Sequence, residues 1–165
     1  MIRSLVMPTP IGRLSLLELD GALIGAGFYD DPAELHNRLH SSMRPLPMTP
    51  ADDLGELSAA VERYFAGEAT ALDDLPVHQP STPVRERMWQ AMREVKAGST
   101  VTYAELAANA GHPGSARVAG NACAANLVAP IVPCHRILGA GNRLNHYGYG
   151  LDAKLWLLRN EGAMI

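Results

Sequence analysis

The sequence is poor in cysteine and lysine and has no long hydrophobic run. Its 165 residues include two cysteines, Cys123 and Cys134, too close together for a disulfide framework and without the spacing of a zinc site. Free thiols are typical of a reducing compartment, so we expect a cytoplasmic protein. No apolar run approaches the ~20 residues of a membrane helix, and the N-terminus lacks the apolar core of a signal peptide. We therefore expect no membrane association.

The scarcity of lysine affects how a polyanion could be bound. Residues 1–80 hold 5 Lys and Arg against 12 Asp and Glu, whereas residues 81–165 hold 9 against 5. A basic C-terminal half fits a polyanionic partner such as nucleic acid. Because only Lys96 and Lys154 occur, phosphate contacts would come mainly from arginine, backbone N–H groups and helix N-termini.

A proline-rich connector divides the chain into two halves. Three prolines fall within residues 75–83, a composition typical of a stiff, extended linker. We expect a scaffold domain over 1–80 and a second domain over 81–165. The first contains Asp20-Gly21 between two apolar runs, which predicts a β-hairpin.

Helices are predicted in the first half at about 32–40 and 51–66, the second with an apolar stripe and a stop at Gly67. His36 and His40 are four apart, the spacing of a metal pair on one helix face. No third ligand is evident nearby, so we expect no metal site.

The second half predicts a helix-turn-helix. Thr82-Pro83 is a strong helix start, and Thr102 with Glu105 forms a capping box before the next helix. A turn at 111–114 leads to another helix over 115–126. In a helix-turn-helix the second helix usually meets DNA, although helical hairpins are also common in proteins that bind none.

The helix over 115–126 has an unusual composition. Its many alanines and Gly120 keep it thin, so that it could approach another surface or simply pack within the domain. Arg117 is its only charged side chain and lies in the first turn, where the helix dipole disfavours positive charge. That position suggests a function outside the fold, such as filling the space of an extruded nucleotide.

Cys134 is the candidate nucleophile. In Pro133-Cys134-His135-Arg136, neighbouring positive charge could lower the pKa of the thiol, and the prolines would stiffen a strand-like stretch. The alternative is that Cys134 packs as a small buried hydrophobe.

Two further features lie near the C-terminus. Residues 144–151 alternate tyrosine and glycine and could line a pocket for a flat base, or form an ordinary aromatic turn. A last helix is expected with Asp152 as N-cap. Glu161 in its final turn opposes the dipole, so it could pair with His135 or simply be solvated.

Taken together, these motifs resemble the methylated-DNA–protein-cysteine methyltransferases, the O6-alkylguanine-DNA repair proteins. Pro-Cys-His-Arg at 133–136 is the family's characteristic motif. The other matches, in the family's order, are Pro10-Ile-Gly-x-Leu14, Tyr64-Phe-x-Gly67, Gly98-x-x-x-x-Tyr103, Ala116-Arg117, Asn126 and Lys154-x-Trp-Leu-Leu-x-x-Glu-Gly162. The resemblance covers the whole chain and is strongest from Val101 to Gly162.

The resemblance implies an α/β (α+β) fold. A small, ribonuclease-H-like sheet-and-helix domain would precede a mostly helical domain with a winged-helix-like helix-turn-helix. It also implies irreversible, single-turnover transfer of the alkyl group of O6-methylguanine, with O4-methylthymine as a possible second substrate, to Cys134. The DNA helix would lie in the minor groove, and no cofactor takes part. We expect a monomer in solution, with cooperative assembly on DNA left open.

The resemblance also assigns site residues. His135, held by Glu161, would act as base through a water, Asn126 would brace the loop, and Tyr103 would help to extrude the nucleotide and protonate the departing guanine. Arg117 would fill the gap in the duplex. The remaining DNA contacts would come from Ser115, Ala116, Gly120, Asn121 and Ala124, and the substrate pocket from Tyr147, Gly148, Tyr149, Ile137 and Lys154.

The chain departs from the family pattern at several positions. Leu127 replaces a usual proline, which would loosen the loop, and Asn145 and Tyr149 replace glycines. We hypothesise that Tyr149 narrows the pocket and selects methyl over bulky adducts, and that it is strained if its φ is positive. The first domain lacks the cysteines that hold zinc in some relatives.

Two other functions are compatible with parts of the pattern. An alkyl-lesion sensor would bind damaged DNA without transfer, but such relatives lack the reactive cysteine. A cysteine hydrolase could use Cys134, His135 and Asn126, although no other oxyanion or substrate-pocket motif is evident.

Overall fold

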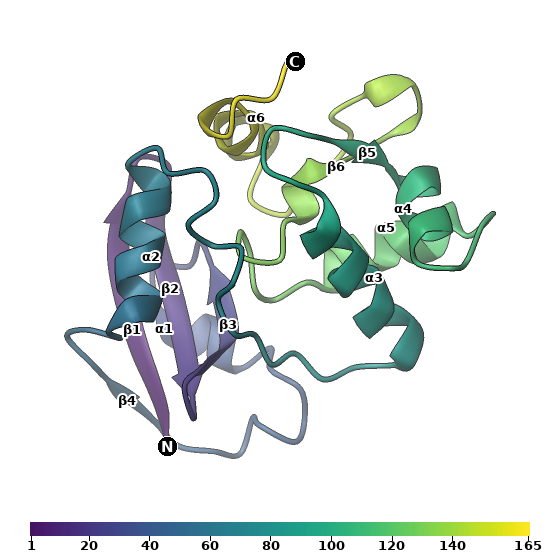
Figure 1. Ribbon diagram of the computed structural model, residues 1–165. Coiled ribbons are helices and arrows are strands. Elements are labelled where there is room, and N and C mark those ends of the chain that lie inside the picture. The colour runs from purple at the N-terminus through teal and green to yellow at the C-terminus, as the bar shows by residue number, and fades with distance from the viewer. The chain divides into compact units, whose positions relative to one another are not determined.

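The computed structural model describes all 165 residues, which form two compact units, each made of two separate stretches of the chain (Figure 1). Unit 1 comprises Met1–Pro80 together with Leu127–Ile131, and unit 2 comprises Ser81–Asn126 and Val132–Ile165. None of the helices combines the length and the apolar character that a membrane crossing needs.

Unit 1 is a four-stranded sheet with a helix on each face. Its strand order is β3-β2-β1-β4, with β4 parallel to β1 and the other pairs antiparallel. Figure 1 shows α2 in front of the sheet and α1 behind it. Two covered faces explain why β2 is buried continuously from Leu14 to Glu18. The elements are β1 (Ile2–Thr9), β2 (Gly12–Leu19), β3 (Ala22–Gly27), α1 (Pro32–His36), β4 (Met48–Pro50) and α2 (Glu56–Phe65).

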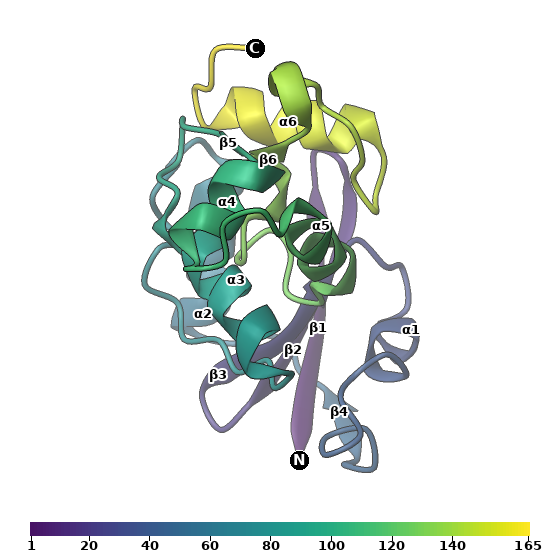
Figure 2. The ribbon, with the colours of Figure 1, turned by 90° about the vertical axis from the view of Figure 1, so that its right-hand side faces the viewer.

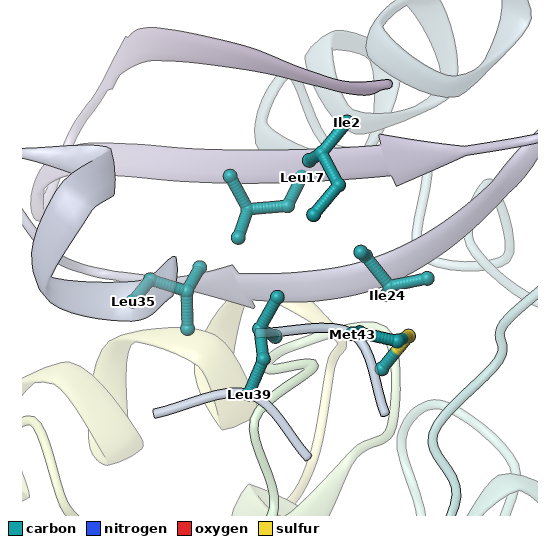
Figure 3. Close-up of a cluster of buried hydrophobic side chains, with 6 residues drawn as sticks. All are labelled: Ile2, Leu17, Ile24, Leu35, Leu39 and Met43. Carbon is teal, nitrogen blue, oxygen red and sulfur yellow. The ribbon is translucent and has the colours of Figure 1, made fainter. Parts of the chain in front are cut away.

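The predicted hairpin and one face of the core form as expected. Asp20 and Gly21 both have positive φ, 52° and 86°, as a type I′ turn requires. On the α1 face, strand side chains meet those of α1 and the segment after it. Figure 3 shows this cluster: Ile2, Leu17, Ile24, Leu35, Leu39 and Met43.

The helices of unit 1 are shorter than predicted. Helix α1 ends at His36, and α2 begins at Glu56, five residues later than expected. Local hydrogen bonds hold the preceding residues outside the helix, since Ser58 Oγ accepts from the Leu54 N–H at 3.0 Å and donates to Asp53 at 2.7 Å. Gly67, with φ 112°, ends α2 as predicted.

Unit 2 is mostly helical, and α4 and α5 lie side by side in it (Figures 1 and 2). A two-stranded parallel sheet pairs β5 with β6. The elements are α3 (Pro83–Glu94), β5 (Val101–Thr102), α4 (Tyr103–Asn109), α5 (Ala116–Ala125), η1 (Cys134–Arg136), β6 (Ile137–Leu138), η2 (Ala140–Asn142) and α6 (Leu151–Asn160). The expected fold class, a small sheet-and-helix unit followed by a mostly helical one, is confirmed.

Local sequence signals set most helix ends of unit 2. Thr82 caps α3, and the capping box of Thr102 and Glu105 forms with both hydrogen bonds present. The prediction for α6 was wrong, because its N-cap is Gly150, with φ 100°, and Asp152 lies inside the first turn. There the carboxylate still faces the positive end of the helix dipole.

Candidate functional site

Cys134 is buried and lies in a turn rather than in a strand. It is the first residue of the 3₁₀ helix η1, and only 8% of the surface of Cys134 is exposed. Burial raises the pKa of the thiol, while the Asn126 side chain and the charge of Lys154 lower it only in part. The hypothesis that His135 and Arg136 favour a thiolate is therefore wrong for the protein without substrate.

Both neighbours of Cys134 bind Glu161 instead. His135 Nε2 lies 2.7 Å from Glu161 Oε2, and Arg136 donates to both carboxylate oxygens, at 2.8 and 3.0 Å. A third Arg136 donor, Nη1, binds the Val95 carbonyl at 2.7 Å. The side chains of His135 and Glu161 are fully buried. The predicted pairing of Glu161 with His135 is thus present, with Arg136 as a third member.

The protonation of this cluster follows from its charges. Burial alone would raise the pKa of Glu161, but His135 and Arg136 together lower it to about 2. Burial lowers the pKa of His135 despite the nearby carboxylate. An ionised carboxylate can only accept, so Nε2 of a neutral His135 carries the proton. Nδ1 is then an acceptor, and it is buried without a hydrogen-bond partner.

Asn126 connects the end of α5 to the thiol. Its Nδ2 donates to the Val132 carbonyl at 2.8 Å and contacts Cys134 Sγ at 3.4 Å. The Asn126 side chain therefore contacts both ends of the short stretch from Val132 to Cys134, a position from which it could brace the loop that carries the thiol.

A cavity of about 880 Å³ in unit 2 brings most of the predicted site residues together. Cys134 lines it, along with one face of α5 and the loop before α6. Its lining comprises Tyr103, Ala116, Arg117, Gly120, Asn121, Cys123, Ala124, Cys134, Asn145, His146, Tyr147 and Gly148. Ser115, the remaining predicted DNA contact, is the N-cap residue of α5.

Three predicted pocket residues lie outside this lining. Ile137 is fully buried in β6, and Tyr149 packs edge-to-face against Tyr147 at 5.5 Å between ring centroids. Lys154 is also fully buried. Its ammonium donates to three carbonyls, those of Ile137 (2.8 Å), His146 (2.9 Å) and Leu144.

Tyr149 does not have a positive φ, so the condition under which we expected strain there is not met, whereas Asn145 has one. Only Asp20, Asn142 and Asn145 among the non-glycine residues have positive φ, with 63° at Asn145. Asparagine tolerates this conformation better than most residues. Asn145 also lines the cavity and places Nδ2 3.4 Å from the Tyr103 hydroxyl.

Sequence reasoning missed two residues of the site. Arg136 was treated as a neighbour of the thiol, but its spacing to Glu161 gives no local signal of their ion pair. Cys123 lines the cavity on α5, and burial raises the pKa of its thiol. Its spacing of three residues from Gly120 on the same helix could have revealed that it shares this face. His36 and His40, the histidines four positions apart, have different partners: His36 hydrogen-bonds the Leu46 carbonyl and His40 hydrogen-bonds Ser42.

Two family models match the chain. Residues 2–79 match the model described as "6-O-methylguanine DNA methyltransferase, ribonuclease-like domain", and residues 83–163 match that described as "6-O-methylguanine DNA methyltransferase, DNA binding domain".

Individual relatives agree. The chain is 36% identical to the methylated-DNA–protein-cysteine methyltransferase of Salmonella typhimurium, covering 83% of this chain and 80% of the relative, and 37% identical to that of Mycobacterium leprae, covering 98% and 93%. Among solved structures, Mycobacterium tuberculosis OGT in complex with DNA superposes with a TM-score of 0.81 at 32% identity, covering 98% of this chain and 92% of that one.

Proposed function

The chain belongs to the 6-O-methylguanine DNA methyltransferase family, and we propose that it repairs DNA by moving the alkyl group of O6-methylguanine irreversibly to its own Cys134. O4-methylthymine is a second candidate substrate. The observation that carries this proposal is that Cys134 lines the cavity beside α5, while the next residue is a neutral histidine oriented by Glu161.

The site supports an in-line displacement. His135 Nδ1 takes the proton of the Cys134 thiol through a bridging water, for which its buried, unpartnered nitrogen is suited. The sulfur then attacks the alkyl carbon, so that an S–C bond forms as the C–O bond breaks. The electron pair passes to guanine, and the Tyr103 hydroxyl at the cavity wall donates the proton that neutralises it.

DNA would engage unit 2 through α5. Ala116, Gly120 and Ala124 leave its cavity-facing side thin, so that the backbone can approach the minor groove closely. Arg117 fills the space left by the extruded nucleotide, as side chains do in other base-flipping proteins. Tyr147 and Gly148 line the cavity that receives the base.

The reaction needs only the thiol and the substrate, so we propose no cofactor. The thioether product leaves each molecule spent after one transfer. We further propose that the protein acts as a monomer in the cytoplasm, where Cys123 and Cys134 would stay free thiols.

Mass spectrometry of the intact protein tests the transfer. After mixing with a duplex containing O6-methylguanine, we expect the mass of one methyl group per molecule, mapped to Cys134 by peptide analysis. The Cys134→Ser protein should bind the duplex and gain no mass. A tight complex of the wild-type protein at unchanged mass would contradict transfer and support a lesion sensor.

Arg117→Ala tests the proposed role of the arginine. It should slow methyl transfer from a duplex by about tenfold or more, since the extruded state loses the side chain that supports it. Transfer from the free base O6-methylguanine should change little, because no nucleotide has to be extruded. Equal losses on both substrates in single-turnover assays would exclude this role.

A further inference from the structure

The segment between Asn126 and Cys134 is held by the sheet of unit 1. β3 is an edge strand, and residues 127–131 belong to the same unit. The Ala26 N–H donates to the Leu127 carbonyl at 2.7 Å, and the Ala129 N–H donates back to Ala26 at 3.0 Å. Ala26 and Val128 thus form a parallel bridge. The residues leading to the thiol extend the ladder of β3.

The proline-rich connector occupies the same edge. The Leu23 N–H donates to the Pro76 carbonyl and the His78 N–H to the Leu23 carbonyl, both at 2.9 Å. One residue further, Gln79 Oε1 accepts a hydrogen bond from the Leu127 N–H at 2.7 Å. Gln79 therefore joins the connector to the first residue of the segment.

The position of this hydrogen bond is informative because Leu127 directly follows Asn126 in the chain. A proline at 127 would restrict the same stretch of backbone in another way. Proline has no N–H to satisfy and confines the residue before it to extended backbone. Asn126 has φ −67° and ψ 121°, which lies in that extended range. The backbone before Leu127 thus has a conformation that a proline at 127 would also allow. Leucine, unlike proline, has an N–H there, and this N–H donates to Gln79.

We propose that Gln79 is a positioning residue for alkyl transfer, because its hydrogen bond restricts the backbone at Leu127 as a proline at that position would. The inference rests on the proposed function of Cys134. Asn126 directly precedes Leu127 and contacts Cys134 Sγ. Because the Leu127 N–H lies in one peptide plane with the Cα of Asn126, holding that N–H restricts the backbone of the residue that braces the thiol. The predicted loosening of the loop by Leu127 is thereby offset.

The experiment uses the full-length protein and two substitutions at one position. Gln79→Leu removes the acceptor, so that the Leu127 N–H has no partner in the conformation that reacts. We therefore expect the single-turnover rate of methyl transfer to fall about tenfold. Gln79→Glu keeps an acceptor oxygen and should stay within about twofold of the wild-type rate. Affinity for the methylated duplex, measured in a Cys134→Ser background, should not change.

Rescue separates positioning from general destabilisation. Adding Leu127→Pro to Gln79→Leu removes the unsatisfied N–H and restores the restriction, so the rate should recover. With proline at 127, glutamine and leucine at 79 should also give equal rates, a comparison that holds even if Gln79→Leu alone folds poorly. A wild-type rate for Gln79→Leu, or no recovery in the double variant, would overturn the proposal.

Failure of the proposed function would look different. The wild-type protein would then transfer no methyl group. The rate at which iodoacetamide carboxamidomethylates Cys134 would still show whether the loop holds the thiol in the same position. Slower labelling in Gln79→Leu with recovery in the double variant would support the positioning role, and identical labelling in all variants would refute it.

Discussion

At the scale of single residues, the guanidinium of Arg136, two positions after the nucleophile, pairs with the carboxylate that orients His135. Three donor groups of Arg136 are engaged, two by Glu161 and one by the Val95 carbonyl. Because the guanidinium stays charged, Glu161 stays ionised, and His135 is oriented with its proton on Nε2. Arg136 thus helps to keep Glu161 ionised, and Glu161 in turn orients His135.

This cluster predicts a specific loss of stability in acid. Glu161 has a pKa of about 2 in the folded protein against an ordinary value of 4.5, so its contribution is complete above pH 4.5 and is lost as the pH falls toward 2. The loss should be on the order of 3 kcal/mol. Urea unfolding of the wild-type protein across this window measures it.

Glu161→Gln provides the matched comparison. It should be less stable at neutral pH, because Arg136 loses its counter-charge, but it should lack the titration between pH 4.5 and 2. The lowered pKa of His135 acts in the same direction below about pH 6.5, and in Glu161→Gln this pKa should fall further because the carboxylate that raises it is gone. Parallel curves for the two proteins would show that Glu161 does not carry the effect.

Residue identities were easier to predict from the sequence than residue environments. Asn126 contacts the Cys134 thiol, and Glu161 pairs with His135, the partner that the sequence suggested for it. The ionisation of the thiol was predicted wrongly, because a neighbour in sequence need not be a neighbour in space. Arg136 turns toward Glu161, 25 positions away, and burial then decides the pKa of Cys134.

At the scale of elements, Lys154 joins α6 to the loop that lines the cavity. Its ammonium binds the carbonyls of Leu144 and His146, which flank the positive-φ residue Asn145, and that of Ile137 in β6. Burial lowers the pKa of Lys154. One buried cation therefore holds three backbone carbonyls, two from the loop and one from β6.

Replacing Lys154 should destabilise the protein through this loop. Lys154→Met keeps the length of the side chain but leaves the carbonyls without their donor, which should cost about 1–3 kcal/mol in urea unfolding. Amide exchange in residues 139–150 should also accelerate. The exposed Lys96 offers a control, because Lys96→Met should change stability by less than about 0.5 kcal/mol. Equal effects of the two substitutions would contradict this role.

Element boundaries followed the sequence where one local interaction dominates. The Asp20-Gly21 turn and the caps at Thr82 and Thr102 were predicted because each depends on residues a few positions apart. The start of α2 was misplaced, since Ser58 and Asp53 compete with the helix for the same backbone groups.

At the scale of the whole molecule, the uneven charge predicts salt-sensitive binding. Residues 81–165 carry the basic excess, so the logarithm of DNA affinity should fall linearly with the logarithm of salt concentration. If Arg117 fills a gap in the duplex, Arg117→Ala should lower affinity without changing that slope. A slope smaller by about 0.9 would instead identify Arg117 as a phosphate contact. Fluorescence anisotropy at several salt concentrations distinguishes the two.

The assignment of residues 127–131 could not be predicted from the sequence. The connector predicted two halves divided near residue 80, yet these five residues join the sheet of unit 1. No periodicity or turn motif marks the segment, because its partners at Ala26 and Gln79 lie about 100 and 50 positions earlier. Such long-range pairing depends on the folded sheet edge.

The docking of this segment on β3 has a consequence for synthesis of the chain. A ribosome makes the protein from its N-terminus, so the sheet of unit 1 acquires residues 127–131 only when most of the 165 residues have been translated. Until then part of β3 presents unpaired N–H and C=O groups to its surroundings, a template for pairing with another chain. We expect this part of the β3 edge to stay open to such pairing until residues 127–131 have been made.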